Sequence, residues 1–153
     1  MQTSPVSIFI ACTKKGLNLK ADIIKHLEAA KRTFVDLGVK DENDNSDHID
    51  VCKILAEKVQ SQSPSFGFII TGHGSDAVMI MNKFKGIRCA QCVDYYTAQM
   101  SRRHNNANCL AFAQDQIGNE VATQGLDAFL SEPFSGGKHE TRVGMITEKE
   151  KKD

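Results

Sequence analysis

The stretch 66–76, FGFIITGHGSD, decides the fold, because an apolar run leads into a turn with two glycines and then into a run of helical character. The run from Phe66 to Ile70 predicts a strand that is buried on both faces. Glycines let backbone N–H groups approach a ligand, and the N-terminus of a helix favours anions. The stretch therefore predicts an anion site at the end of a strand, although Gly72-x-Gly74 alone is not a specific signal.

Apolar runs of this kind recur along the chain, separated by segments in which apolar residues follow helical spacing. Strands are predicted at residues 6–11, 34–37, 66–70, 87–93 and 109–113. Helices are predicted after Gly16, around 52–59, after Gly74, at 94–103 and at 119–130. This alternation predicts an α/β fold of the doubly wound, Rossmann-like type, a three-layer sandwich with a five-stranded parallel sheet. Ligands of such sheets bind at the carboxyl ends of the strands, where residues 71–76 lie.

The length of 153 residues fits a single domain, expected at 1–147, followed by a charged tail at 148–153 that we expect to fray. Lysine plus arginine number 19 and aspartate plus glutamate also 19, so no global field attracts nucleic acid or a membrane. No apolar stretch is long enough to span a membrane, and the polar start lacks the pattern of a signal peptide. We therefore expect a cytoplasmic protein.

The five cysteines are an odd number in a chain without an export signal, so a disulfide framework is not expected. Cys89-x-x-Cys92 is the one spacing that suggests zinc or redox chemistry. It lies in a predicted strand, which would direct the two sulfur atoms to opposite faces, and no second pair exists. The cysteines are therefore predicted to be reduced, buried thiols, and no metal site is expected.

Four motifs follow one another along the chain. They are Asn82-Lys-x-x-Gly-Ile-Arg88, Tyr96-Thr-Ala-x-Met-Ser-Arg-x-His-Asn105, Ala107-Asn108 and Phe134-x-Gly-Gly-x-His139. Together they resemble the ribose-5-phosphate isomerase B family, which also holds the two subunits of galactose-6-phosphate isomerase, and the resemblance covers Ile8 to Ile146. It implies an aldose-ketose isomerase that acts on a phosphorylated sugar through an enediolate and needs no cofactor. It also implies sites between the subunits of a homodimer or homotetramer.

Several site residues match the family. The resemblance implies that His104 opens the sugar ring, because an imidazole titrates near neutral pH, and that Asn105 belongs to the same site. It implies that Gly72, Gly74 and neighbouring amides hold the enediolate. Lys138 and Arg142 match two arginines that contact phosphate. A lysine at position 138 keeps the charge but loses the planar, two-pronged grip of a guanidinium group.

Other positions depart from the family. Thr71 stands where many members have a cysteine, and a hydroxyl group is far too weak an acid to supply the base that a thiolate provides. Thr13 and Lys14 replace an aspartate and histidine pair, and Asp115 replaces an arginine. Asp76 replaces a loop glycine, and since aspartate tolerates left-handed backbone angles, we expect the turn to survive.

Three interpretations of these departures stay open. An active enzyme would use a substitute base, for which His73, Asp76 and His48 are candidates. Alternatively, the chain is the cysteine-lacking subunit of a hetero-oligomer, since His104-Asn-Asn106 is similar to the A subunit of galactose-6-phosphate isomerase. Third, the chain is a degenerate homologue that binds phosphosugars without turnover. The candidate site holds His104, Thr71, His73 and Asp76 as catalytic residues and Gly72, Gly74, Asn105, Lys138, Arg142, His48 and Thr13 as substrate-binding residues.

Overall fold

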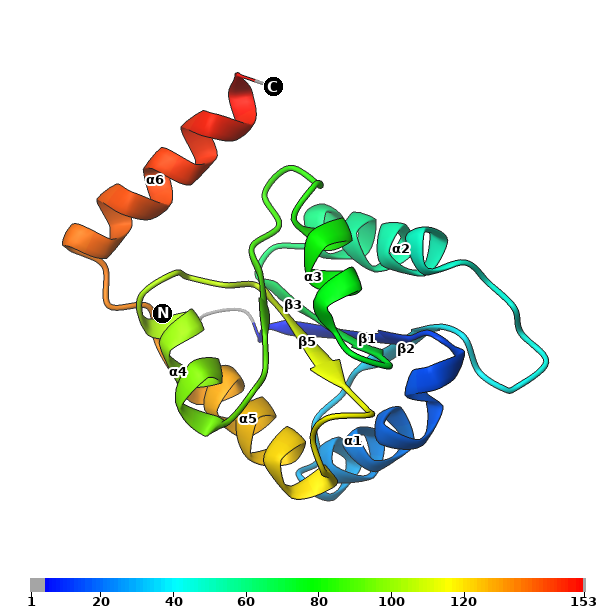
Figure 1. Ribbon diagram of the computed structural model, residues 1–153. Helices are drawn as coiled ribbons and strands as arrows, with labels where there is room; N and C mark the ends of the chain where they lie inside the picture. Colours follow the sequence, from blue (N-terminus) through cyan, green and yellow to red (C-terminus); the bar gives the residue numbers. More distant parts are fainter. Residues whose placement is uncertain (1–4, 153) are drawn as a thin grey trace.

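Five parallel strands form one sheet in the computed structural model, which describes residues 5–152 (Figure 1). The order across the sheet is β2-β1-β3-β5-β4. The strands are β1 (Ser7–Cys12), β2 (Val35–Gly38), β3 (Ser65–Thr71), β4 (Cys89–Gln91) and β5 (Cys109–Ala113). The predicted five-stranded parallel sheet is therefore confirmed. β4 is shorter than the predicted strand at 87–93, because it lies at the edge of the sheet and pairs with β5 alone.

Helices cover both faces of this sheet. They are α1 (Leu17–Ala29), α2 (His48–Ser61), α3 (Ser75–Met81), α4 (Tyr95–Arg103), α5 (Asn119–Ser131) and α6 (Lys138–Lys151), with a 3-10 turn, η1 (Lys14–Gly16), before α1. Figure 1 shows α2 and α3 on one face and α1, α4 and α5 on the other. The predicted three-layer, doubly wound architecture is thus confirmed.

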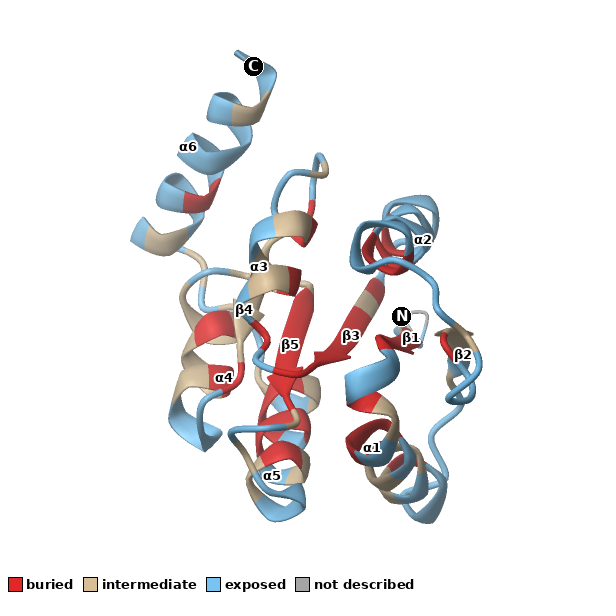
Figure 2. Ribbon diagram, turned by 45° about the vertical axis from the view of Figure 1, so that its right-hand side comes forward, coloured by how far each residue is buried: buried red, intermediate tan, exposed pale blue. Residues whose placement is uncertain are grey.

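The core lies between the sheet and its helices, and Figure 2 shows the central strands β1, β3 and β5 almost entirely buried. Phe68 on β3 packs against Phe112 on β5 and Phe129 on α5, with ring centroids 6.2 and 5.6 Å away. Buried aromatic rings contribute much of the apolar area that stabilises a core. These strands therefore form the buried centre of the domain, and the polar residues described below lie at their two ends.

Capping residues fix the start of the two helices that position the site. The Asp47 side chain accepts a hydrogen bond from the Ile49 amide at 2.8 Å, which caps α2 immediately before His48. Asp94 and Thr97 form a reciprocal capping box at the start of α4. Since α4 begins at the carboxyl end of β4, its last residues lie toward the amino end of the sheet.

Helix α6 was not predicted from the sequence. It projects away from the sheet layers (Figures 1 and 2), and Val143 is its only buried residue within the described chain. Its few apolar residues do not form the continuous stripe that signals a helix packed on a core. The Glu150 carboxylate accepts a hydrogen bond from the Gly86 amide at 3.1 Å and so contacts the loop before β4. Residues 148–151, expected to be a frayed tail, form the last turn of α6.

All five cysteines are free and buried, as predicted. Burial raises the pKa of Cys12 to about 11 and the pKa values of Cys52 and Cys92 to about 12. The Cys92 sulfur packs so closely on α5 that a Cβ atom on Gly125 would lie 2.4 Å from it. Cys89 and Cys92 are therefore part of the core. Between residues 5 and 152, no helix has the length and apolar character needed to cross a membrane.

Candidate functional site

The first group of polar residues lies at the carboxyl edge of the sheet and centres on Thr71, the last residue of β3. The Thr71 side chain is fully buried. Its hydroxyl group donates a hydrogen bond to Asp76 Oδ1 at 2.9 Å and accepts one from the Gly74 amide at 2.8 Å. We call Thr13, His48 and the residues 71–76 the carboxyl-edge half-site.

Asp76 connects this half-site to two helices. Its Oδ1 also accepts a hydrogen bond from the Ala77 amide at 2.9 Å, and its Oδ2 lies 3.3 Å from Nε2 of His48, the first residue of α2. Asp76 lies in the first turn of α3 and has no left-handed backbone. The turn is present, as expected, but it does not require left-handed backbone angles at Asp76. Gly74, with φ of 75°, makes the turn because only glycine adopts such angles freely.

The backbone at this edge is tightly packed. A Cβ atom on Gly16 would lie 2.4 Å from the Ile70 carbonyl oxygen, so the end of η1 rests directly on β3. A Cβ atom on Gly72 would lie 3.1 Å from Asp115 Oδ2, which places that carboxylate beside the glycine turn. Thr13 is 2% exposed, and its hydroxyl group has no hydrogen-bond partner within the described chain.

The His73 side chain, unlike those of Thr71 and Asp76, lies outside the hydrogen-bond network. Its backbone carbonyl accepts a hydrogen bond from Gln91 Nε2 at 3.0 Å, which anchors the glycine turn to β4. Its imidazole ring is exposed and makes no hydrogen bond or ion pair with residues 5–152. Of the three candidate bases, the structure therefore joins Asp76 and His48 to Thr71 and leaves the His73 ring outside the network.

A second group of polar residues surrounds the end of α4. His104 caps α4, and its ring stacks on that of His139 in α6, with centroids 4.2 Å apart and planes inclined by 12°. Burial lowers the pKa of His139, and the charges of His104, Lys138 and Arg142 lower it further. We call His104, Asn105, Lys138, His139 and Arg142 the amino-edge half-site. The stack was not predicted, because the resemblance implies no role for His139.

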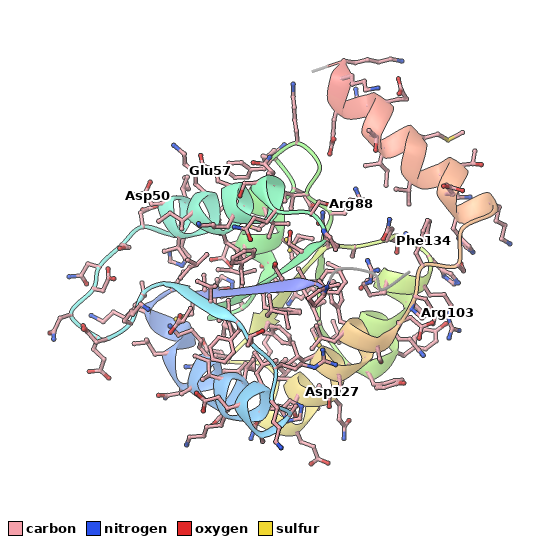
Figure 3. The ribbon with its side chains drawn as sticks, turned by 180° about the vertical axis from the view of Figure 1, so that it is seen from behind. Asp50, Glu57, Arg88, Arg103, Asp127 and Phe134 are labelled. Carbon is pink, nitrogen blue, oxygen red and sulfur yellow. The ribbon has the colours of Figure 1, made fainter. Side chains whose placement is uncertain are left out.

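The segment between α5 and α6 is held against the end of α4. The amide and hydroxyl groups of Ser135 both donate hydrogen bonds to the Arg103 carbonyl, at 3.0 and 2.8 Å. Arg103 itself forms an ion pair with Glu132. Figure 3 shows Arg103 and Phe134 on the same side of the molecule, where the chain leaves α5 for α6. These contacts position His139 next to His104.

The two half-sites lie at opposite ends of the sheet. Four residues after His104, the Asn108 carbonyl accepts a hydrogen bond from the Gly67 amide, near the start of β3. Thr71 lies at the other end of that strand. A strand of this length spans roughly 20 Å, since each residue adds about 3.3 Å. His104 and Asp76 of one chain are therefore too far apart to act on one small sugar.

The amino-acid sequence and the fold both match known proteins. Residues 8–146 match the model of the ribose/galactose isomerase family. The probable ribose-5-phosphate isomerase B of Mycoplasma pneumoniae is 39% identical over 91% of each chain. The galactose-6-phosphate isomerase subunit LacA of Enterococcus faecalis is 31% identical over 86% of this chain and 90% of its own.

A crystal structure of ribose-5-phosphate isomerase B from Mycoplasma genitalium with bound ribulose-5-phosphate superposes with a TM-score of 0.92. Its sequence is 34% identical, and the match covers 99% of this chain and 100% of that one. The chain therefore shares with this protein the fold along its whole length, in addition to the four motifs. The chain belongs to the ribose/galactose isomerase family.

Proposed function

We propose that the chain is an aldose-ketose isomerase for a phosphorylated sugar of the ribose-5-phosphate or galactose-6-phosphate class, which reacts through an enediolate. The observation that carries the proposal is the pair of half-sites, one with imidazole and cationic groups and the other with a carboxylate and open backbone amides. Isomerisation needs both groups of residues. The imidazole and cationic groups would open the ring and hold the phosphate, and the carboxylate and amides would move a proton and stabilise the oxyanion.

In the amino-edge half-site, His104 would give a proton to, and take it from, the ring oxygen of the sugar. The stacked His139 ring restricts the rotation of the His104 side chain and so keeps its imidazole plane fixed. Lys138 and Arg142 lie on the same helix as His139 and supply two positive charges for the phosphate group.

In the carboxyl-edge half-site, backbone amides would stabilise the oxyanion of the enediolate. The Gly74 amide is already bonded to Thr71, so it is not open to a ligand. The amides of Gly72 and His73 donate no hydrogen bond within the described part of the chain. We assign the binding of the oxyanion to these two amides. Because residue 72 is a glycine, no side chain at that position covers them.

A complete site then requires a second subunit. Because the half-sites of one chain lie at opposite ends of the sheet, the amino-edge half-site of one copy must meet the carboxyl-edge half-site of another. A two-fold symmetric homodimer forms two such sites at once. The similarity to LacA subunits supports one alternative, a hetero-oligomer with a homologous chain. Thr71, in place of a thiol, supports the other, a protein that binds phosphosugars without turnover.

The test is an aldose-ketose isomerase assay on the purified chain with ribose-5-phosphate, allose-6-phosphate and galactose-6-phosphate, together with calorimetric binding of each sugar. We expect turnover of at least one sugar. Binding without turnover would contradict an enzyme that is active alone and favour a missing partner or a binding protein. Failure to bind any of the three would contradict the phosphosugar site itself.

A further inference from the structure

We infer that Asp76 is the base that carries the proton between C2 and C1 of the sugar, and that His48 is its positioning residue. The inference rests on the proposed isomerase function and names the group that function needs. It comes from one chain of contacts, in which the hydroxyl group of Thr71 points to Asp76 and His48 approaches the same carboxylate from α2.

Thr71 itself is a structural hydroxyl. Its proton is directed to Asp76 Oδ1 and its oxygen accepts the Gly74 amide, so both its hydrogen-bonding roles are taken within the chain. A hydroxyl group also does not ionise near neutral pH. Asp76 Oδ1 lies 2.9 Å from the Thr71 oxygen, which makes this carboxylate the ionisable group next to the position where many family members have a thiol.

The Asp76 carboxylate keeps room for a substrate proton. An ionised carboxylate has about four lone-pair positions. Thr71 and the Ala77 amide take the two on Oδ1, and His48 Nε2 faces Oδ2 at 3.3 Å. One position on Oδ2 therefore stays open. The side chain is 27% exposed, so a ligand at the sheet edge can reach it, while three contacts fix its orientation.

The other two candidate bases are less well placed. The His73 ring makes no contact within the cluster. The His48 ring is 51% exposed and reaches the cluster only through Asp76. His48 therefore acts on the carboxylate, by contacting Oδ2 while Thr71 and the Ala77 amide bind Oδ1, and Asp76 acts on the substrate.

Asp76 can carry out the proton transfer without any further reactant. The Asp76 carboxylate takes the proton from C2 of the open-chain aldose, the C2–H electron pair forms the C1=C2 double bond, and the carbonyl pair moves to O1. The protonated Asp76 then returns the proton to C1, while the O2 proton passes to O1 and C2 becomes the carbonyl carbon. Asp76 ends as the carboxylate from which it started, and no oxidant or reductant takes part.

The decisive variant is Asp76→Asn, because asparagine keeps an oxygen that accepts the Thr71 and Ala77 hydrogen bonds but cannot take up the proton. We expect kcat to fall about 10²- to 10⁴-fold, the usual contribution of a general base, with a change in KM of less than about threefold. Exchange of the C2 hydrogen with deuterium oxide, followed by NMR, should be lost in parallel. Asp50→Asn, an exposed carboxylate in the first turn of α2, is the matched control and should keep the wild-type kcat.

His48 is tested by two substitutions. His48→Leu removes the contact to Asp76 and should lower kcat about tenfold with little change in KM, since a positioning residue acts on the carboxylate and not on the sugar, in contrast to the substrate-binding role expected from the sequence. His48→Gln keeps a donor for Oδ2 and should recover most of that loss. Equal losses in both variants, or a loss confined to KM, would overturn the positioning role.

Failure of the base assignment and failure of the isomerase function give different results. A wild-type chain that turns over a sugar, with an Asp76→Asn variant that keeps kcat within threefold, would overturn the base assignment and leave the isomerase standing. A wild-type chain that turns over none of the sugars would overturn both. Turnover in the wild type with loss of both kcat and C2 exchange in Asp76→Asn is the expected result.

Discussion

The two half-sites differ in how many of their residues are expected, from the resemblance, to match the family. At the amino edge, the resemblance implies matching residues at His104, Asn105 and Arg142 and one charge-conserving change at Lys138. At the carboxyl edge, the resemblance implies departures at Thr13 and Thr71, and the Thr71 hydroxyl group is hydrogen-bonded inside the chain. Since the two half-sites lie at opposite ends of the sheet, a substitution in one is not expected to disturb the contacts of the other.

At the amino edge the expected effect is as large as that of Asp76→Asn at the carboxyl edge. His104→Ala should reduce turnover of the ring-closed sugar about 10²- to 10⁴-fold, because the proton donor to the ring oxygen is lost. Phosphate binding should stay nearly intact, since Lys138 and Arg142 remain. The measurement compares kcat with the calorimetric affinity for the sugar phosphate. His26→Ala is the control, because His26 pairs with the surface residue Asp127, labelled in Figure 3, away from either half-site. Equal losses of turnover and affinity would contradict this division of roles.

The second prediction concerns the recovery of activity when two inactive variants form a mixed dimer. Asp76→Asn and His104→Ala chains are each expected to be nearly inactive, but a mixed dimer pairs one intact carboxyl edge with one intact amino edge. Random mixing of equal amounts should restore about a quarter of the wild-type sites, because half the dimers are mixed and each has one complete site. The rate is measured after the two chains are unfolded and refolded together. No recovery in a preparation shown by tagged subunits to contain mixed dimers would exclude a site shared between copies.

The third prediction concerns phosphate affinity. Arg142→Ala should weaken sugar-phosphate binding about 10- to 100-fold, as expected for the loss of a hydrogen bond between charged groups. Lys138→Arg should strengthen binding a few-fold, because a guanidinium group can bind two phosphate oxygens at once. Calorimetric titration measures both, and kcat at saturation should change little in either variant. A large fall in kcat with unchanged affinity in Arg142→Ala would place that residue in the chemistry instead.

The same contrast shows what the sequence predicts well and what it does not. Continuous apolar runs identified the strands, and β5 was predicted at its observed bounds, because a strand buried on both faces tolerates few polar residues. The contacts between His104 and His139 and between His48 and Asp76 join residues from different helices. They depend on how those helices pack, so neither periodicity nor motif spacing reveals them. The resemblance could name the residues of each half-site but not the bonds among them.

The smallest effect tests whether the carboxyl edge is a bonded unit. Thr71→Val keeps the shape of this buried side chain but removes its hydroxyl group, which leaves the Gly74 amide without its acceptor and Asp76 Oδ1 with the Ala77 amide alone. The free energy of unfolding should fall by about 1–3 kcal/mol, the cost of leaving buried polar groups unpaired. Urea denaturation measures it, with the exposed Thr33→Val as the control, expected to stay within about 0.5 kcal/mol of wild type. An unchanged stability would mean that Thr71 does not hold Asp76 in place, and the carboxylate would then owe its orientation to His48 and the Ala77 amide alone.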